Sequence, residues 1–449
     1  MTNIKPEQLK RVLKPVHLWA IAVGLVISGE YFGWNLGWGV SGTIGFLIAT
    51  LVITLMYITF IFSYTELTTA IPHAGGAFAY AYRALGPFGG LAAGYATLID
   101  FLFATPAIAF ALGAYLNFLW PVVPVLYSAL FFNLVFIGVN ILGVKESAAF
   151  SVFITILAVA ELLLFMGIVS PHFKMSNYLG NPMPFGWAGV FAALPYAVWF
   201  YLAIEGVAMV AEEVKEPKRN IPKGYISGLA TLVFLALGVM IFTGGLTDWR
   251  RFSKLDYPLP EAISISLGKG NSLTRIFAGI GLFGLIASFH GTILASSRQV
   301  FAMARSGYMP RFLSAVNHRF KTPHWALIAG GLISFIALFT GTTSQVVEIS
   351  VMGAVVMYMM SMISLFVLRA KEPALERPFT APFYPVFPSI ALIISAITLF
   401  AMIYFYLELS LSFFSGLAAA VLIFVLMGKH KVKITDDVLL EEAEILIRN

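Results

Sequence analysis

The sequence predicts an all-α integral membrane protein that crosses the bilayer about twelve times. Hydrophobic residues make up 59% of the chain and charged residues only 11%, whereas a soluble domain carries about 25% charged residues. Apolar runs of the roughly 20 residues that a membrane-spanning helix needs recur along nearly the whole of the chain. Because the sequence has no cysteine, a disulfide framework and a thiolate metal site are excluded.

The predicted spans are separated by mostly short connections. The longest connections are expected at residues 170–187, 247–272 and 301–323. The tail after Lys433 is acidic and is expected to be a solvated helix or disordered. The twelve predicted spans are 17–40, 43–71, 88–118, 123–143, 149–169, 188–211, 223–246, 273–300, 324–341, 345–369, 385–407 and 411–428.

The lysines and arginines indicate how the chain is oriented. With the N-terminus inside, 22 of the 28 basic residues fall in inside segments and 6 in outside segments. Positive residues concentrate on the cytoplasmic side of membrane proteins. We therefore expect both termini in the cytoplasm and the chain in the plasma (inner) membrane. Because the first apolar run lacks a cleavage pattern of small residues, the first helix should remain in the mature protein.

Acidic residues interrupt four of the predicted spans, at Glu30, Asp100, Glu161 and Glu205. No basic residue lies near the centre of a predicted span to pair with them. A carboxylate that faces lipid is costly, so buried acids pair, become protonated or bind a cation. The missing partner is therefore a proton, a sodium ion or the substrate.

The first span contains a candidate helix break at residues 28–33, where two glycines and a serine surround Glu30. Glycine permits an unwound backbone, which is tolerated at membrane depth only where it lines a cavity. Broken helices at the midplane mark the binding site of many transporters. The alternative is that Gly33 and Gly37 serve close packing between helices.

The sixth span contains an aromatic run, Trp199, Phe200 and Tyr201, followed by Glu205. Aromatic faces attract cations. However, with 15% aromatic residues in the chain, most of them are expected to be ordinary core residues. A single glycine, Gly206, makes the indication of a break weaker here than in the first span.

Other polar residues in the spans have less certain roles. Asp100 and Glu161 are expected to face a cavity, and contact with the substrate is left open for both. His290 is a candidate proton relay, although a hydrogen-bonded buried histidine is the favoured interpretation. Glu66, near the end of the second span, is expected to be structural and to bond loop backbone.

Enzyme signatures are missing from the sequence. It contains no phosphate-binding loop, no His-Glu-x-x-His, no Gly-x-Ser-x-Gly and no clustered histidines. An enzyme or a primary pump is therefore not expected, and neither is a cofactor or a metal ion. The expected partners are a small-molecule amine and the lipid bilayer, with a proton or sodium as candidate coupling ion. Nucleic acid is not an expected partner, since orientation explains the net charge of +6.

Four segments carry a family resemblance. They are IPHAGGAFAYAYRALG at 71–86, which follows Glu66, then EEVKEPKRNIP at 212–222, RQVFAMARSGYMP at 298–310, and Thr322-Pro323. With them the whole chain resembles the amino acid–polyamine–organocation superfamily of permeases. Within this superfamily it is most similar to the ethanolamine permease group, because the first helix reads similarly around Glu30.

The resemblance implies the fold of the leucine-transporter type. Helices 1–5 and 6–10 then form inverted repeats, and helices 11 and 12 are appended. The implied organisation is a cytoplasmic N-terminus at 1–16, a transporter domain at 17–428 and a cytoplasmic tail at 429–449. Within the transporter domain, the first repeat covers 17–169, the second covers 188–369, and the last two helices cover 385–428.

The resemblance also places the substrate at the midplane, between the breaks of the first and sixth helices. Amino-acid carriers of this kind hold the substrate carboxylate on exposed amides of the first break. Here Glu30 would repel a carboxylate, and it is expected to neutralise an ammonium beside Ser28, Gly29 and Tyr31. Ethanolamine has an ammonium and a hydroxyl but no carboxylate, so it is the expected substrate. The alternative is an amino-acid permease with altered carboxylate binding.

The sixth helix is expected to supply the other side of the site. Trp199 matches an aromatic residue that closes the site in some family members, and Phe200 and Tyr201 would extend this wall. Glu205 matches the acid that follows the sixth-helix break. Asp100 is expected to accept a hydrogen bond from the substrate hydroxyl. Alternating access of a carrier is favoured over an amine channel, because broken-helix sites suit occlusion of one substrate.

One departure from the family concerns coupling. Several proton-coupled members carry a lysine in helix five, three residues after a threonine, whereas here Thr155 is followed at that distance by Ala158. Coupling through that lysine is excluded. Glu161 and His290 are the expected coupling candidates, and passive exchange is the alternative.

Overall fold

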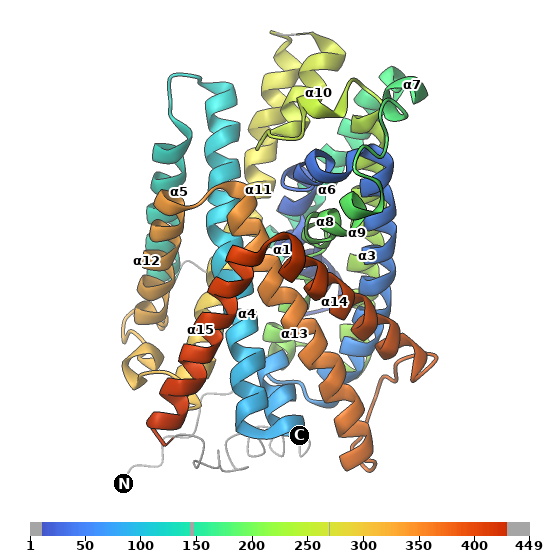
Figure 1. The fold of residues 1–449 in the computed structure, drawn as a ribbon. Helices are drawn as coiled ribbons and strands as arrows, with labels where there is room; N and C mark the ends of the chain where they lie inside the picture. The colour runs from blue at the N-terminus through green and yellow to red at the C-terminus, as the bar shows by residue number, and fades with distance from the viewer. Residues whose placement is uncertain (1–10, 144–147, 269, 429–449) are drawn as a thin grey trace.

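The computed structural model describes residues 11–143, 148–268 and 270–428, which form a bundle of steeply inclined helices (Figure 1). Over these residues the structure contains no strand, and one isolated bridge pairs Leu13 with Val214. Helices α7 (Met175–Tyr178) and α10 (Pro258–Leu267) lie over the upper end in Figure 1. We call the opposite end of the bundle the lower end. The acidic tail predicted after Lys433 falls outside the described residues.

The described helices confirm the twelve predicted spans. Nine of them, counted over the described ranges, are long and apolar enough to cross a membrane, and three shorter apolar helices occupy the first, fourth and ninth spans. In chain order the spans are formed by α1 (Pro15–Val26) with α2 (Ser28–Tyr31), α3 (Leu36–Ala70), α4 (Ala77–Leu119), α5 (Val125–Ile141), α6 (Ala148–Val169), α8 (Gly186–Trp199) with η2 (Ile204–Glu213), α9 (Pro217–Gly244), α11 (Ser272–Arg305), α12 (His324–Thr340), α13 (Thr343–Lys371), α14 (Val386–Phe405) and α15 (Leu407–Leu426).

Local sequence explains where several of these helices begin. Proline occupies the first turn of α1 and α9, where the missing N–H is not needed for an intrahelical bond. Thr342 and Gln345 form a reciprocal capping box at the start of α13. Besides α7 and α10, the described parts of the long predicted connections contain η1 (Ser170–His172), η3 (Trp249–Arg251) and η4 (Arg311–Ser314), and α11 extends into the third connection as far as Arg305.

The first span is broken in its middle, as the glycines predicted. Its helical geometry is lost at Phe32, which is extended, and at Gly33, whose φ is +89°. The break therefore follows Glu30 and does not begin at Ser28. A second irregularity at Gly42, with φ of +73°, separates the end of this span from the second span within α3. This is the boundary that the apolar pattern placed between residues 40 and 43.

The sixth span is broken between α8 and η2, over residues 200–203. Ala203 adopts a left-handed conformation with φ of +80°, which is uncommon for a residue other than glycine. Beyond the break the chain continues as a 3-10 helix. The first span of each predicted repeat is therefore the broken one, which agrees with the inverted-repeat fold.

Burial separates central from peripheral helices. In the most apolar stretch of α4, 83% of the residues are buried, against 17% in α15. A methyl group at Gly353 on α13 would lie 2.5 Å from the carbonyl oxygen of Ala96 on α4. A side chain does not fit here, so this glycine allows the two backbones to approach closely. α4 and the broken spans thus form the interior that surrounds the candidate site.

Candidate functional site

The two helix breaks are held against each other by Trp199. Its indole Nε1 donates a 3.0 Å hydrogen bond to the carbonyl oxygen of Phe32, at the break of the first span. A methyl group at Gly33 would lie 2.5 Å from Nε1 of Trp199, and one at Gly29 would lie 2.4 Å from its carbonyl oxygen. The glycines of the first break are therefore needed both for backbone conformation and for space.

A small cavity lies beside the breaks and has room for about one water molecule. This volume is below that of an organic amine, so the cavity is closed to a molecule of that size. Of the predicted site residues, Ser28 and Trp199 line the cavity. The full lining is Leu25, Val26, Ser28, Ala104, Ile108, Trp199, Leu202, Ala203 and Thr292.

Ser288 on α11 was not predicted, yet it anchors the first span beside this cavity. Its hydroxyl donates a 2.6 Å hydrogen bond to the carbonyl oxygen of Leu25 and lies 2.8 Å from the hydroxyl of Ser28. Thr292, one turn further along α11, lines the cavity itself. Ser288 and Thr292 are four residues apart in an apolar span, so they lie on one helix face. This spacing could have been found in the sequence.

Glu30 is fully buried but does not line the cavity. Neither carboxylate oxygen of Glu30 has a hydrogen-bond partner among the described residues. Its carbonyl oxygen accepts a 3.0 Å bond from the indole of Trp34, and Trp34 in turn stacks on Phe200 with ring centroids 5.8 Å apart. The predicted ammonium partner is therefore a buried acid, and an aromatic stack that joins the two breaks begins at its backbone.

Tyr31 points away from the cavity, toward the fifth span. Its hydroxyl donates a 2.7 Å hydrogen bond to Oε2 of Glu161 on α6. On the other side of the ring, a methyl group at Gly284 of α11 would lie 2.9 Å from the Tyr31 hydroxyl. Oε1 of Glu161 has no partner within the described part of the chain. The structure thus brings a predicted binding residue and a predicted coupling residue together.

Phe200 and Tyr201 enclose the breaks from the side of the second span. Phe200 lies 6.1 Å from Phe46 between ring centroids. The hydroxyl of Tyr201 lies 2.7 Å from that of Thr54. Both aromatic residues are buried and belong to the wall around Glu30, whereas neither lines the cavity.

Asp100 on α4 and Glu205 on η2 are both buried, and each carboxyl group lies beside a hydroxyl of α13. The hydroxyl of Ser350 lies 3.3 Å from Oδ1 of Asp100, and the hydroxyl of Tyr358 lies 3.3 Å from Oε2 of Glu205. The other oxygens, Oδ2 of Asp100 and Oε1 of Glu205, have no hydrogen-bond partner among the described residues.

His290 lies on a different face of α11 from the cavity. Its Nδ1 is 3.0 Å from the side-chain nitrogen of Asn140 on α5, and its ring packs against Phe136. This is the hydrogen-bonded buried histidine that the sequence favoured over a proton relay. Within the described residues no group of three His, Cys, Asp or Glu side chains is placed to hold a metal ion.

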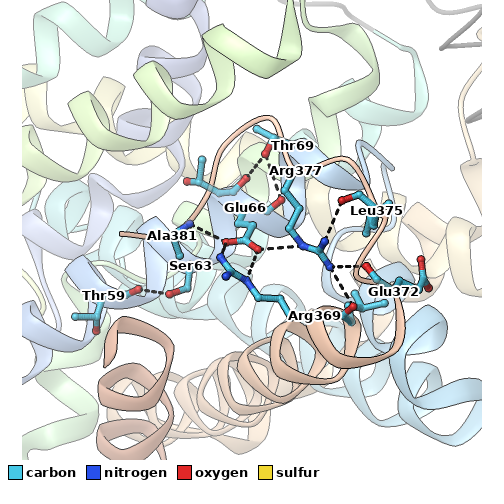
Figure 2. Close-up of polar contacts among 11 residues, drawn as sticks. Thr59, Ser63, Glu66, Thr69, Arg369, Glu372, Leu375, Arg377 and Ala381 are labelled. Carbon is cyan, nitrogen blue, oxygen red and sulfur yellow. Dashed lines mark hydrogen bonds and ion pairs between the residues drawn. The ribbon is translucent and has the colours of Figure 1, made fainter. Parts of the chain in front are cut away.

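Glu66 forms the centre of an ion-pair cluster at the lower end of the bundle (Figure 2). Its carboxylate is 2.5 Å from Nη2 of Arg369 and 3.3 Å from Nε of Arg377. It also accepts a 2.7 Å hydrogen bond from the backbone N–H of Ala381. The expected structural role, bonding loop backbone, is confirmed.

Three of the four segments that carried the resemblance also meet at the lower end. The carboxylate of Glu212, after the sixth span, accepts a 2.7 Å bond from the backbone N–H of Ala74, after the second span. Arg298, from the third segment, lies 3.7 Å from Glu213. These contacts join the connecting segments at one end of the bundle, below the two helix breaks.

Comparison with known proteins agrees with this architecture. The family described as amino acid permease matches residues 13–427. The chain belongs to the amino acid permease family. This permease is a membrane-embedded transporter of the amino acid–polyamine–organocation superfamily, with a small-molecule substrate.

Its relatives differ in what they carry. An uncharacterized transporter of Rhizobium meliloti (strain 1021) is 30% identical to the permease over 420 residues, which cover 89% of each chain. The methylthioribose transporter of Bacillus subtilis (strain 168) is 29% identical over 416 residues, covering 86% of this chain and 87% of its own. The branched-chain amino acid permease BcaP of the same organism is 26% identical over 408 residues, with the same two coverages.

Proposed function

We propose that this permease is a secondary transporter that carries a small organic amine, ethanolamine in the first place, by alternating access. The substrate site is the region between the two helix breaks. The small cavity beside the breaks widens to form this site when the transporter opens. In this proposal one group of helices rocks against the other and exposes the breaks to each side of the membrane in turn. The distribution of basic residues supports a plasma (inner) membrane location, with the lower end and both termini in the cytoplasm.

The observation that carries this proposal is the carboxylate of Glu30, which has no hydrogen-bond partner among the residues that the structure describes. A buried charge without a partner is costly, so a cation is the partner that this carboxylate favours. A substrate ammonium would supply that charge, and the surrounding Trp34 and Phe200 rings would add cation–π attraction. A substrate carboxylate would be repelled by the same group.

A second candidate is an amino-acid substrate. The family description and the branched-chain amino acid permease among the relatives favour it. In that case the ammonium of the amino acid would bind near Glu30, and its carboxylate would bind away from it, on the side of Ser28 and the cavity. The methylthioribose carrier among the relatives supports a family site that also takes substrates other than amino acids.

Uptake into proteoliposomes tests the two candidates directly. Radiolabelled ethanolamine is offered to the purified, reconstituted permease, with choline, putrescine, alanine and serine as competitors. Saturable uptake and counterflow of ethanolamine, with weak competition by alanine and serine, is the expected result. Strong competition by either amino acid, with no ethanolamine counterflow, would assign the permease to amino acids.

We also propose that transport is coupled to an ion, with Glu161 and His290 as the candidates that the sequence supplied. The contact of Glu161 with Tyr31 favours Glu161, since it joins a titratable group to the broken first span. Imposing a pH gradient and, separately, a sodium gradient at zero membrane potential distinguishes the two ions. Equilibration without accumulation under either gradient would indicate a facilitator or an exchanger.

A further inference from the structure

An open groove lies between the lower parts of α1 and α9, on the outer surface of the bundle. Its volume is about 570 Å³, which is within the range of about 300–1,000 Å³ that small-molecule sites occupy. Because both helices belong to predicted membrane spans and the groove residues Val16 and Ala230 are exposed, the groove faces lipid. The residues that line it include Pro15, Val16 and Trp19 of α1 and Lys223, Ser227 and Ala230 of α9.

The shape of the groove is fixed by direct contacts between the two helices. A methyl group at Gly224 of α9 would lie 2.4 Å from Cβ of Leu18 on α1, so the backbones approach closely beside the groove. The indole Nε1 of Trp19 donates a 3.1 Å hydrogen bond to the hydroxyl of Thr231 on α9. The groove is therefore a depression between two helices that are held together.

The lining of the groove is suited to a hydrocarbon chain. Apart from Lys223, its two side chains with polar groups, Trp19 and Ser227, use them within the protein. The Ser227 hydroxyl donates a 2.6 Å hydrogen bond to the carbonyl oxygen of Lys223, and the Trp19 N–H is bonded to Thr231. A polar ligand would lose its hydration here without gaining hydrogen bonds, whereas an acyl chain has none to lose.

Lys223 supplies a positive charge to the groove. Its side chain is exposed, and none of the ion pairs formed by the described residues includes it. A lysine at such a position rests its aliphatic stem on apolar surface and extends its ammonium toward the head-group region. Lys14, which directly precedes Pro15, is a second exposed lysine outside these ion pairs. Lysines near the membrane surface attract anionic head groups.

From the apolar lining and the charge of Lys223 we infer that the groove binds an anionic phospholipid, with an acyl chain between α1 and α9 and the phosphate beside Lys223. The orientation under the proposed function places this lipid in the inner leaflet, whereas the binding itself does not depend on the substrate. A lipid that contacts both helices stabilises the position of α1 seen here. Since α1 leads into the first helix break, the lipid is placed to influence how the permease opens.

Fluorescence of Trp19 tests the lipid site, because this ring lines the groove and brominated acyl chains quench tryptophans that they contact. The chain has eight tryptophans, so the Trp19 signal is the difference between the wild type and Trp19→Phe. The purified permease is reconstituted in phosphatidylcholine vesicles with increasing fractions of brominated phosphatidylglycerol or, separately, brominated phosphatidylcholine. Phosphatidylglycerol should quench Trp19 at about fivefold lower fractions, since one lysine contributes about that factor to binding of an anionic head group.

Two variants separate the head group from the acyl chain. Lys223→Gln should abolish the fivefold preference and leave quenching by phosphatidylcholine unchanged. Ala230→Phe fills the groove and should reduce quenching by both lipids. Lys174→Gln, at an exposed position before α7 at the upper end, is the control and should keep the preference. Equal quenching of wild-type Trp19 by both lipids, or a preference that persists in Lys223→Gln, would overturn the inference. Quenching by neither lipid would also overturn it and indicate that protein, such as a second copy of the chain, covers the groove.

Thermal unfolding in detergent gives a second measurement. A ligand that binds the folded state raises the apparent melting temperature, so phosphatidylglycerol should raise it more than phosphatidylcholine does in the wild type. This difference should disappear in Lys223→Gln and in Ala230→Phe, and an unchanged difference in both would refute the site. Elution of each variant as a single species in size-exclusion chromatography is checked first. Neither measurement needs a substrate, so a failure of ethanolamine uptake leaves the lipid site standing, and a failure of lipid selectivity leaves the proposed function standing.

Discussion

The hydroxyl of Tyr31 donates a 2.7 Å hydrogen bond to Oε2 of Glu161 and so ties the broken first span to the fifth. Both residues are buried, and the glycine face of α11 closes over them at Gly281 and Gly284. The bond joins the element that carries Glu30 to a helix at the side of the bundle. Any displacement of the first span away from α6 must break it.

A double-mutant cycle measures this bond. Tyr31→Phe leaves the Glu161 carboxyl without its hydroxyl donor, and a buried group left unsatisfied costs about 1–3 kcal/mol. Glu161→Gln should cost less, since an amide oxygen can still accept the bond. The double variant should be no less stable than Tyr31→Phe, as measured by apparent melting temperature in detergent. Strict additivity would show that the two side chains are not coupled in the folded permease.

Trp199 should control how long substrate stays occluded. Trp199→Ala removes the ring that closes the cavity and the bond to Phe32. Release of bound ethanolamine should accelerate by about tenfold or more, the equivalent of roughly 1.4 kcal/mol. Trp199→Phe retains a ring but no N–H, and it separates the two contributions. Unchanged release from both variants would make Trp199 an ordinary core residue.

Glu30 should determine the charge that the site selects. Glu30→Gln removes one partner of a desolvated charge pair, so ethanolamine binding should weaken by about 2 kcal/mol or more. Alanine and serine should bind more tightly to the same variant, because repulsion of their carboxylates is lost. Calorimetric titration measures both effects, and Glu408→Gln, at an exposed position of α15, is the control. Wild-type affinity in Glu30→Gln would contradict the assignment of the ammonium site.

Glu66 should contribute to stability more than exposed acids at the same end do. Glu66→Gln leaves Arg369 and Arg377 without their carboxylate (Figure 2), and breaking a largely buried ion pair costs about 3 kcal/mol. Glu376→Gln breaks the exposed pair with Lys218 and should cost less than about 1 kcal/mol. The comparison uses apparent melting temperatures at one heating rate. Equal shifts of the melting temperature in the two variants would show that Glu66 contributes no more to stability than an exposed acid does.

Asp256 should make stability depend on pH. Burial raises the pKa of Asp256 from 3.8 to about 6, although a hydrogen bond from Thr343 opposes this rise. The folded permease therefore binds this proton more tightly than the unfolded chain, and stability falls as pH rises from about 4 to about 6.

Asp256→Asn removes this dependence. At neutral pH it should raise the apparent melting temperature, by no more than the equivalent of about 3 kcal/mol, since one pKa unit corresponds to about 1.4 kcal/mol. At about pH 4 the wild type and the variant should be equally stable, because the wild-type carboxyl is then protonated. A lower melting temperature of the variant at neutral pH would contradict the desolvation of Asp256.

Much of the first break was predictable, whereas the second was not. Gly29 and Gly33 are a local signal, and the structure shows both the irregular backbone at Gly33 and the close approach of Trp199. At the second break the left-handed residue is Ala203, which has no such signal in the sequence. Its conformation is maintained by the surrounding helices, and only the family resemblance indicated a break there.

The partners of the buried acids were beyond sequence reasoning for a similar reason. The acids themselves stand out from apolar runs, so Glu30, Asp100, Glu161 and Glu205 were all found. Their contacts join residues from spans that are distant in the chain. Asp100 and Glu205 lie beside hydroxyls of α13, Glu161 bonds Tyr31, and the carboxylate of Glu30 has no hydrogen-bond partner in the described structure.

The sequence by itself determined the membrane class, the twelve spans and the positions of the buried acids, because the hydrophobic effect and the cost of charge in lipid act on each segment separately. Only the tertiary structure decided which groups meet. Close approaches at Gly353 and Gly284 bring particular helix faces together, and the contacts of Asp100 with Ser350 and of Tyr31 with Glu161 follow from that packing. Such pairings depend on the relative rotation and depth of whole helices, which no single segment specifies.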